Sequence, residues 1–331
     1  MPRANLLVSI ALLLTSVPVY SQTAKDRSPE DAIKLSTELV PLDVHVVEKK
    51  TRHAITGLSK TDFEVYEDGV KQQILQFSQD KLPLSVVLLL DASGSMWTVL
   101  EKLRATAHEA LQTLKPEDEV AVVVTADDTR LVQDFTKDRF TVTESLRQLD
   151  FKAFGDNGIF LHDSLYRAAT HLQRAANPGD RRLVIAVTDN VTIPNHNWRF
   201  FQQEQAESLL LEAGVVVCGL LVDHNKGIRA FLKITSLPAR RSGGDLHDYA
   251  EMTGGEVLSV GGDTVGQRLI ELINHLRTRY SLAFAPSNTK RDGKFRKIKV
   301  RLTDETDRRI RNSGSEDYAI ATRSGYYGRK N

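Results

Sequence analysis

Three oxygen-bearing side chains occupy alternate positions in one short turn of the chain. They belong to Asp91, Ser93 and Ser95, and the turn comes directly after the mostly apolar run 84–90. Gly94 lets the backbone bend sharply between the two serines. One carboxylate and two hydroxyls on a single turn place hard oxygen ligands in a small volume, which is the chemistry that Mg²⁺ and Mn²⁺ prefer. The spacing therefore predicts part of a cation site.

A second carboxylate takes the same place after another apolar stretch. Asp189 follows directly on residues 183–188, as Asp91 follows on 84–90. Open sheets built of alternating strands and helices bind their ligands outside the carboxyl ends of the strands. We therefore expect Asp189 to reach the same rim as Asp91.

Apolar strands and amphipathic helices alternate through the middle of the chain. Continuous apolar strands indicate burial on both faces, as in a parallel sheet. The strands are expected at residues 84–90, 120–125, 183–188 and 215–222, and the helices at about 99–114, 160–176, 200–213 and 264–278. This order predicts an α/β fold with a doubly wound, mostly parallel, Rossmann-like sheet and helices on both faces.

Short β-like segments stand on both sides of this α/β region. They cover residues 39–47 and 70–77 before it, and 280–284, 295–302 and 318–322 after it. Neither flank has enough strands to be stable alone. The simplest arrangement pairs the N- and C-terminal flanks in one small β-sandwich-like lobe, with the α/β domain inserted between its strands. Two unrelated appendages are the alternative.

The N-terminus has the layout of a secretory signal. Arg3 precedes the apolar run 6–14, and the small residue Ser21 ends the segment. We expect a signal peptide at residues 1–21 with cleavage near Ser21, a periplasmic or secreted protein, and no membrane span after cleavage. An uncleaved N-terminal anchor is the alternative. Residues 22–35 are polar and are expected to form a disordered leader.

Charge, cysteine content and missing motifs exclude several classes of protein. Lys and Arg number 44 against 43 Asp and Glu, which leaves a net charge of +1, so no nucleic-acid binding is expected. The one basic cluster, residues 290–301, alternates charged and apolar residues as a solvated edge strand does. Cys218 is the single cysteine and lies in an apolar run, so it is expected in the core. The sequence has no zinc motif and no phosphate-binding loop.

The D-x-S-x-S turn, the strand-terminal Asp189 and the segment 250–256 together resemble a von Willebrand factor type A (VWFA) domain with its metal-ion-dependent adhesion site (MIDAS). The flanks resemble those of the bacterial exported VWFA-related family, at residues 58–69, 292–300 and 323–327. The resemblance implies that residues 36–82 are the first part of the lobe, 83–279 the VWFA domain and 280–328 the second part of the lobe.

The resemblance also implies a set of metal ligands. By position, the ligands of Mg²⁺ or Mn²⁺ are Asp91, Ser93, Ser95 and Asp189. The family usually supplies a further threonine, and that position holds Ile159, whose branched alkyl side chain we expect at the mouth of the site. Asp156 or Asn157 on the same loop is expected to substitute for it, directly or through a water.

The function implied by the resemblance is binding of a protein partner. The cation keeps an open position, and an acidic residue of the partner completes its shell. The loop after Asp189 carries His196 and Trp198, which we expect to contact the partner. A metal-free scaffold and a metal-assisted hydrolase are the alternatives. Because the chain has no G-x-S-x-G elbow and no general base recognisable by motif, we expect no enzymatic activity.

Overall fold

The computed structural model describes residues 39–79, 82–155, 158–177, 181–192, 201–223, 244–313 and 317–329. The expected signal peptide, residues 1–21, and the expected leader, residues 22–35, lie outside these ranges. No helix within these ranges is long and apolar enough to cross a membrane.

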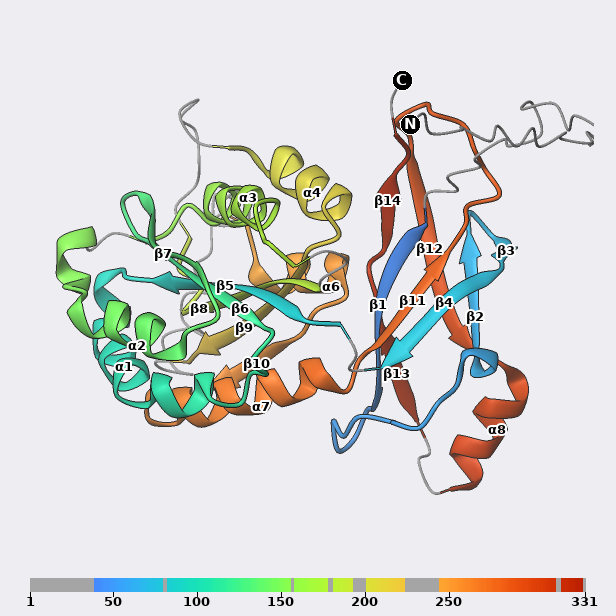
Figure 1. Cartoon of the computed structure of the whole chain (residues 1–331), viewed down its shortest axis with the longest axis horizontal. Helices are drawn as coiled ribbons and strands as arrows, with labels where there is room; N and C mark the ends of the chain where they lie inside the picture. The colour runs from blue at the N-terminus through green and yellow to red at the C-terminus, as the bar shows by residue number, and fades with distance from the viewer. Residues whose placement is uncertain are drawn as a thin grey trace, which may run out of the picture. The chain divides into compact units, whose positions relative to one another are not determined.

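A six-stranded sheet runs through the α/β part of the described chain in the order β10-β9-β8-β5-β6-β7 (Figure 1). Its strands are β10 (Val257–Val260), β9 (Val216–Val222), β8 (Arg181–Thr188), β5 (Leu84–Asp91), β6 (Glu119–Thr125) and β7 (Thr129–Thr136). Neighbouring strands are parallel except β7, which pairs antiparallel with β6 at the edge. The predicted α/β fold with a mostly parallel central sheet is confirmed.

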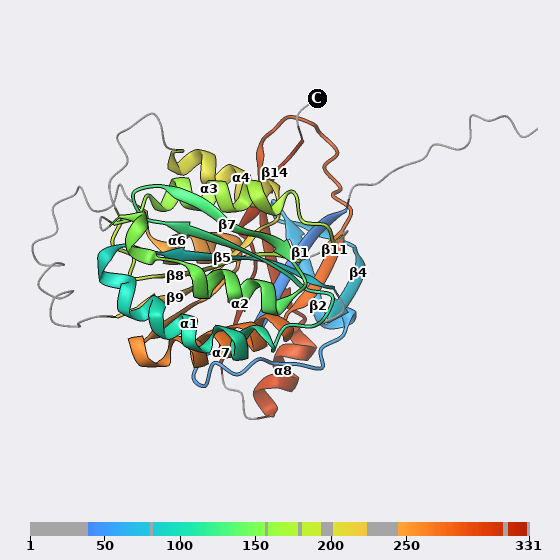
Figure 2. The same cartoon turned by 60° about the vertical axis from the view of Figure 1, so that its left-hand side comes forward.

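Helices cover both faces of this sheet. One face carries α1 (Trp97–Leu111), α2 (Arg139–Gln148) and α7 (Val265–Arg277), and the other carries α3 (Leu161–Leu172), α4 (Gln203–Glu212) and α6 (Leu246–Thr253). Figures 1 and 2 show α3 and α4 on the opposite side of the strands from α1, α2 and α7. The sheet is therefore doubly wound, as the alternation of strands and helices predicts.

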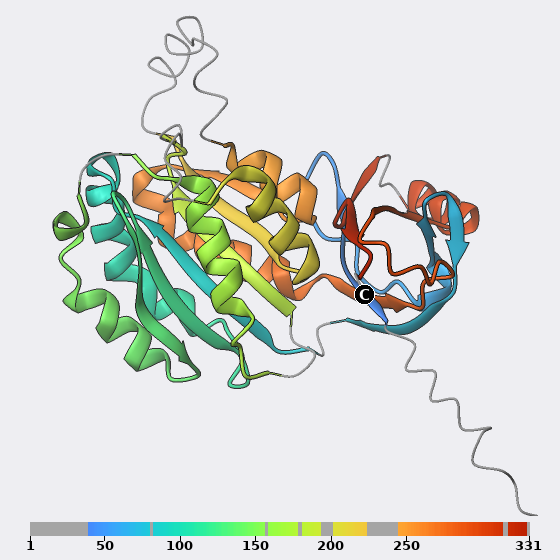
Figure 3. The same ribbon diagram turned by 90° about the horizontal axis from the view of Figure 1, so that it is seen from above.

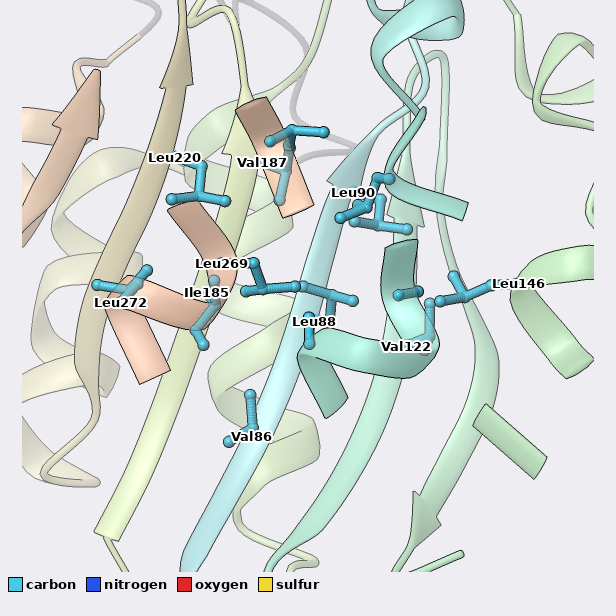
Figure 4. Packing of buried hydrophobic residues seen from close by; sticks show 14 of the residues in the cluster. Val86, Leu88, Leu90, Val122, Leu146, Ile185, Val187, Leu220, Leu269 and Leu272 are labelled. Atoms are coloured by element: carbon cyan, nitrogen blue, oxygen red, sulfur yellow. The ribbon is translucent and has the colours of Figure 1, made fainter. Parts of the chain in front are cut away.

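Alternate residues of β5 point to opposite faces of the sheet. Val86, Leu88 and Leu90 belong to the apolar cluster beneath α1 and α7, and Val87 and Leu89 belong to the cluster beneath α3 and α4. Figure 4 shows side chains of the first cluster packed together. All residues of β5 are buried. Burial on both faces explains why the strand sequence is nearly continuous in apolar residues.

Four elements of the α/β part have no counterpart among the predicted ones: β7, α2, α6 and β10. The residues of β7 are half-buried or exposed because the strand lies at the sheet edge, so its sequence has no apolar run. Helix α2 buries only two apolar side chains, Val142 and Leu146. Short, partly covered elements of this kind leave too weak a periodic pattern to be recognised.

The two flanks form two further sheets, ordered β13-β1-β11-β4 and β14-β12-β2-β3. The N-terminal flank supplies β1 (Val40–Glu48), β2 (Phe63–Glu67), β3 (Val70–Gln72) and β4 (Ile74–Gln79). The C-terminal flank supplies β11 (Tyr280–Phe284), β12 (Phe295–Leu302), β13 (Tyr318–Ala321) and β14 (Gly325–Tyr327), with helix α8 (Asp304–Asn312) between β12 and β13. Figure 3 shows the blue and cyan strands of the first flank beside the orange and red strands of the second.

Both sheets of the lobe combine strands from the two flanks. Val44 of β1 is opposite Tyr280 of β11, and Val65 of β2 is opposite Val300 of β12. These four side chains belong to one apolar core between the sheets. The inserted-domain prediction is therefore confirmed. The expected single strand 70–77 is wrong, because β3 and β4 pair in different sheets.

A buried ion cluster joins the lobe to the α/β part. Asp43 of β1 accepts a hydrogen bond from Nε of Arg181 at 2.5 Å and another from Nε of Arg279. Arg279 is completely buried, and it also donates to the carbonyl oxygen of Gly254. Burial alone would raise the pKa of Asp43, but the two arginines hold it below its usual value. The charged form of Asp43 is thus part of the folded structure.

Candidate functional site

The D-x-S-x-S turn and Asp189 meet at one edge of the central sheet. Asp91 is the last residue of β5, and Asp189 follows the last residue of β8. The two strands are parallel neighbours, with Leu90 opposite Val187. Their carboxyl ends therefore lie side by side, and the structure brings Asp91, Ser93, Ser95 and Asp189 together as the sequence predicts.

Short hydrogen bonds link the oxygens of this site. Ser95 Oγ donates to Asp189 Oδ2 at 2.6 Å, and the hydroxyl oxygens of Ser93 and Ser95 are 3.4 Å apart. Asp91 Oδ1 accepts from the backbone N–H of Ser93 at 3.0 Å, and Asp91 Oδ2 accepts from Thr188 Oγ1 at 2.6 Å. The carboxylates and hydroxyls thus form one connected group of oxygens.

Local structure fixes the turn that carries the serines. Gly94–Met96 form a 3₁₀ turn that leads directly into α1. Trp97 Nε1 donates to the carbonyl oxygen of Ala92 at 2.8 Å, and the side chain of Met96 is completely buried. The turn is therefore held from both ends. It also lies at the N-terminus of a helix, where the backbone dipole favours negatively charged groups.

The electrostatics of the site fit a divalent cation. Burial and the charge of Asp189 raise the pKa of Asp91 to about 6. Two neighbouring carboxylates repel each other, and a cation between them would remove that repulsion. Among the residues that the structure describes, no three His, Cys, Asp or Glu side chains are grouped so that they could hold a metal. A cation here would therefore depend on the hydroxyls of Ser93 and Ser95 as well as on the two carboxylates.

The side chain of Ile159 does not lie at the mouth of the site, and that expectation is wrong. The residue is 1% exposed and belongs to the apolar cluster beneath α3 and α4. Its backbone N–H donates to the carbonyl oxygen of Val191 at 3.2 Å, which ties the loop before α3 to the loop after Asp189. Counting along a motif gives the position of a residue but not the direction of its side chain.

Four predicted site residues lie outside the described ranges. They are the substitute ligands Asp156 and Asn157 and the partner contacts His196 and Trp198. Close to the site, the described chain offers one exposed apolar side chain, Val191, which follows Asp189 by two residues and is 46% exposed. An apolar contact beside the carboxylates is thus available to a partner.

Three residues that sequence reasoning missed hold the site together. Thr188 donates to Asp91 and accepts at 2.9 Å from the backbone N–H of Asn190. Asn190 has a left-handed backbone, with φ of 59°. Its side-chain amide donates to Asp245 Oδ1 at 3.0 Å, which fastens the loop to the N-cap of α6. Thr188 was recognisable as the neighbour of Asp189, but nothing in the sequence pointed to Asp245.

The segment 250–256 has a structural role away from the site. Thr253 Oγ1 accepts from the backbone N–H of Val217 at 2.9 Å. A Cβ atom at Gly255 would lie 1.8 Å from the carbonyl oxygen of Val217, so only glycine fits there. These residues let the end of α6 pack against β9, and they do not contribute to the oxygen group at the strand ends.

The part of the chain that carries this site matches a known protein family. The family model described as von Willebrand factor type A domain matches residues 86–191, which include Asp91, Ser93, Ser95 and Asp189. None of the curated proteins compared with the chain matches it.

Several solved structures resemble the chain at low sequence identity. The conserved hypothetical protein BatB from Bacteroides thetaiotaomicron is 16% identical with a TM-score of 0.42, over 58% of this chain and 98% of that one. A von Willebrand factor type A structure from Catenulispora acidiphila is 14% identical with a TM-score of 0.43, over 67% of this chain and 52% of that one. Proximal thread matrix protein 1 from the mussel byssus, with a zinc-occupied MIDAS motif, is 15% identical with a TM-score of 0.43, over 63% of this chain and 49% of that one.

Proposed function

We propose that this protein binds a protein partner and does not catalyse a reaction, since residues 86–191 match the family model described as von Willebrand factor type A domain. The observation that carries the proposal is the convergence of two carboxylates and two hydroxyls from two distant segments at one sheet edge. The site offers metal ligands without a general base recognisable by motif. A metal-assisted hydrolase would use the same ligands but would also need a general base.

In this proposal the residues Asp91, Ser93, Ser95 and Asp189 hold Mg²⁺ or Mn²⁺. The cation supplies an electrophilic position that an acidic side chain of the partner occupies. Ser93 and Ser95 orient their oxygens because the turn is fixed by α1, and Thr188 orients Asp91 by donating to it. Asp156 and Asn157 are proposed as further ligands.

The partner contact is proposed to extend along the loop that follows Asp189. Val191 contributes exposed apolar surface beside the carboxylates. His196 and Trp198 would add polar and aromatic contacts farther along the same loop, since aromatic side chains contribute strongly to protein interfaces. The partner is thus expected to combine an acidic residue with an adjacent apolar group.

Export from the cytoplasm is the second part of the proposal. The charged and apolar pattern of residues 1–21 supports a cleaved signal peptide. The mature protein would then act in the periplasm or outside the cell, where its partner would be found.

A capture experiment from envelope extract tests the binding role. The full chain should retain a partner in Mg²⁺ and release it in a chelator. Asp91→Ala should fail to retain it, while Asp128→Ala, which removes an exposed carboxylate on the turn between β6 and β7, should behave as the wild type. A partner that stays bound in the chelator and to Asp91→Ala would instead favour the metal-free scaffold.

A further inference from the structure

A cavity of about 600 Å³ lies at the end of the central sheet opposite the candidate cation site. One wall is the outward face of the lobe sheet, formed by residues of β1, β4 and β11. The facing wall is formed by the first residues of β8 and β9 and by the end of α4. This volume is in the range of pockets that enclose small organic ligands.

The lining of the cavity is apolar with an excess of positive charge. Apolar residues make up most of it, among them Leu39, Leu82, Leu210, Val215 and Ala283. The charged side chains are Arg181, Arg182, Arg323 and Asp43. Three guanidinium groups thus share the cavity with one carboxylate. Asp43 is moreover bound to Arg279, which lies behind the wall.

Arg181 is a buried cation with unused hydrogen-bonding capacity. Its side chain is 5% exposed, and its Nε donates to Asp43 at 2.5 Å. Its two terminal nitrogens are closed off from solvent and have no hydrogen-bond partner among the described residues. A buried donor without an acceptor is costly, and for a charged group the cost is larger. A negative charge in the cavity beside Arg181 would reduce the cost of burying its positive charge.

Arg323 brings a second buried positive charge to the same cavity. It donates to the carbonyl oxygens of Leu211 at 3.1 Å and Pro41 at 2.5 Å, and its Nε has no partner in the described chain. Burial lowers the pKa of Arg323 to about 10. Arg182 donates to the carbonyl oxygen of Ala213, two residues beyond Leu211, so both guanidinium groups lie at the end of α4. The positive charge is therefore concentrated on one side of the cavity.

We propose that this cavity binds a small monocarboxylate with an apolar body. The carboxylate accepts hydrogen bonds from the half-buried guanidinium group of Arg182, in the planar, paired geometry that arginine offers to carboxylates, and the buried charges of Arg181 and Arg323 attract it. The apolar body packs between the outward face of the lobe sheet and the residues at the end of α4. A fatty acid and the C-terminus of an apolar peptide share this chemistry. The proposal stands apart from the cation site and from its function.

Titration calorimetry of the full chain with two acids tests the proposal and separates the two sources. Decanoate represents the fatty acid, and acetyl-Leu-Leu with a free carboxyl group represents the peptide end. At least one acid should bind, and decanamide or the peptide amide should bind about ten-fold more weakly or worse, because the amide lacks the negative charge that strengthens hydrogen bonds to guanidinium groups. Binding should persist in a chelator and in Asp91→Ala, which separates this site from the cation site.

Two variants of the cavity and one control complete the test. Arg182→Gln should weaken binding of the acid about ten-fold, and Arg182→Lys, which keeps the charge but loses the paired geometry, should weaken it less than Arg182→Gln does. Ser281→Trp places a large side chain in the cavity and should abolish binding. The matched control is Arg147→Gln, on the exposed surface of α2, which should bind as the wild type. Circular dichroism checks that each variant is folded.

Three results would each overturn the proposal. The first is that neither acid binds to the wild type. The second is that the uncharged analogues bind as tightly as the acids. The third is that folded Arg182→Gln and folded Ser281→Trp both bind as the wild type does.

Discussion

Ser95 Oγ donates a 2.6 Å hydrogen bond to Asp189 Oδ2, although the two residues are 94 positions apart in the chain. The bond joins the turn after β5 to the loop after β8. It forms because the two strands are parallel neighbours and end at the same edge of the sheet. The candidate site is therefore assembled by strand pairing, and its chemistry depends on both segments.

Removal of Asp91 is expected to abolish cation binding. Titration calorimetry with Mg²⁺ and Mn²⁺ should detect binding to the wild type and none to Asp91→Ala, because one of the two carboxylates is lost. Asp128→Ala is the control and should bind as the wild type. Equal cation binding by Asp91→Ala would rule out the proposed ligand set.

Substitution of Ile159 by threonine is expected to lower stability without improving cation binding. Its position in the family motif alone would suggest a gain of about ten-fold in affinity. The side chain is however buried in an apolar cluster, so Ile159→Thr should cost about 1–3 kcal/mol by removing apolar contacts and burying a hydroxyl. Urea unfolding and calorimetry measure the two effects. A ten-fold gain in affinity would show that the side chain reaches the cation.

Loss of the Asp43 carboxylate is expected to destabilise the junction between the lobe and the α/β part. Asp43→Asn leaves Arg181 and Arg279 buried without their counter-charge, and breaking a buried pair in this way costs about 3–5 kcal/mol. Urea unfolding at neutral pH measures this loss of stability. Asp317→Asn breaks an exposed pair with Lys49 and should have no measurable effect. Similar stability of both variants would contradict the structural role of Asp43.

The free energy of unfolding is expected to fall as the pH is lowered, because of His45. Burial and the positive charge of Arg279 lower the pKa of His45 to about 3. The negative charge of Glu256 acts in the opposite direction but is outweighed. The folded form thus keeps His45 neutral while the unfolded chain takes up a proton below about 6.5, so about 2 kcal/mol is lost between about pH 7 and 5.

His45→Gln should remove that loss, as unfolding curves at the two pH values would reveal. His275 gives the opposite sign, because Glu256 raises its pKa. The stabilisation by His275 is fully present below the pKa that histidine has in the unfolded chain, and it is lost as the pH rises through the pKa of His275 in the folded protein. His275→Gln should therefore make the decline at low pH steeper, and a His45→Gln variant as pH-sensitive as the wild type would contradict the prediction.

Cleavage near Ser21 is expected in the exported protein. N-terminal sequencing of the protein recovered from its native envelope should begin at about residue 22. An intact Met1 in that material would point to an uncleaved anchor.

The sequence by itself determined the α/β class, the strands β5, β6, β8 and β9, and the turn that carries Asp91, Ser93 and Ser95. Residues 280–284 and 295–302 were also predicted with the bounds that the structure gives to β11 and β12. These features are local: a run buried on both faces is apolar throughout, and a strand with one buried face alternates. Such patterns can be recognised without knowing which segments of the chain pack against each other.

Only the tertiary structure decided which distant residues meet and where each side chain points. The pairing of Asn190 with Asp245, the ion cluster of Asp43 and the inward direction of Ile159 all depend on contacts between segments far apart in the chain. The cavity with Arg181 and Arg323 is likewise formed by surfaces from both flanks and the α/β part. Such contacts leave no periodic pattern, because the energy that selects them comes from packing of the whole chain rather than from neighbouring residues.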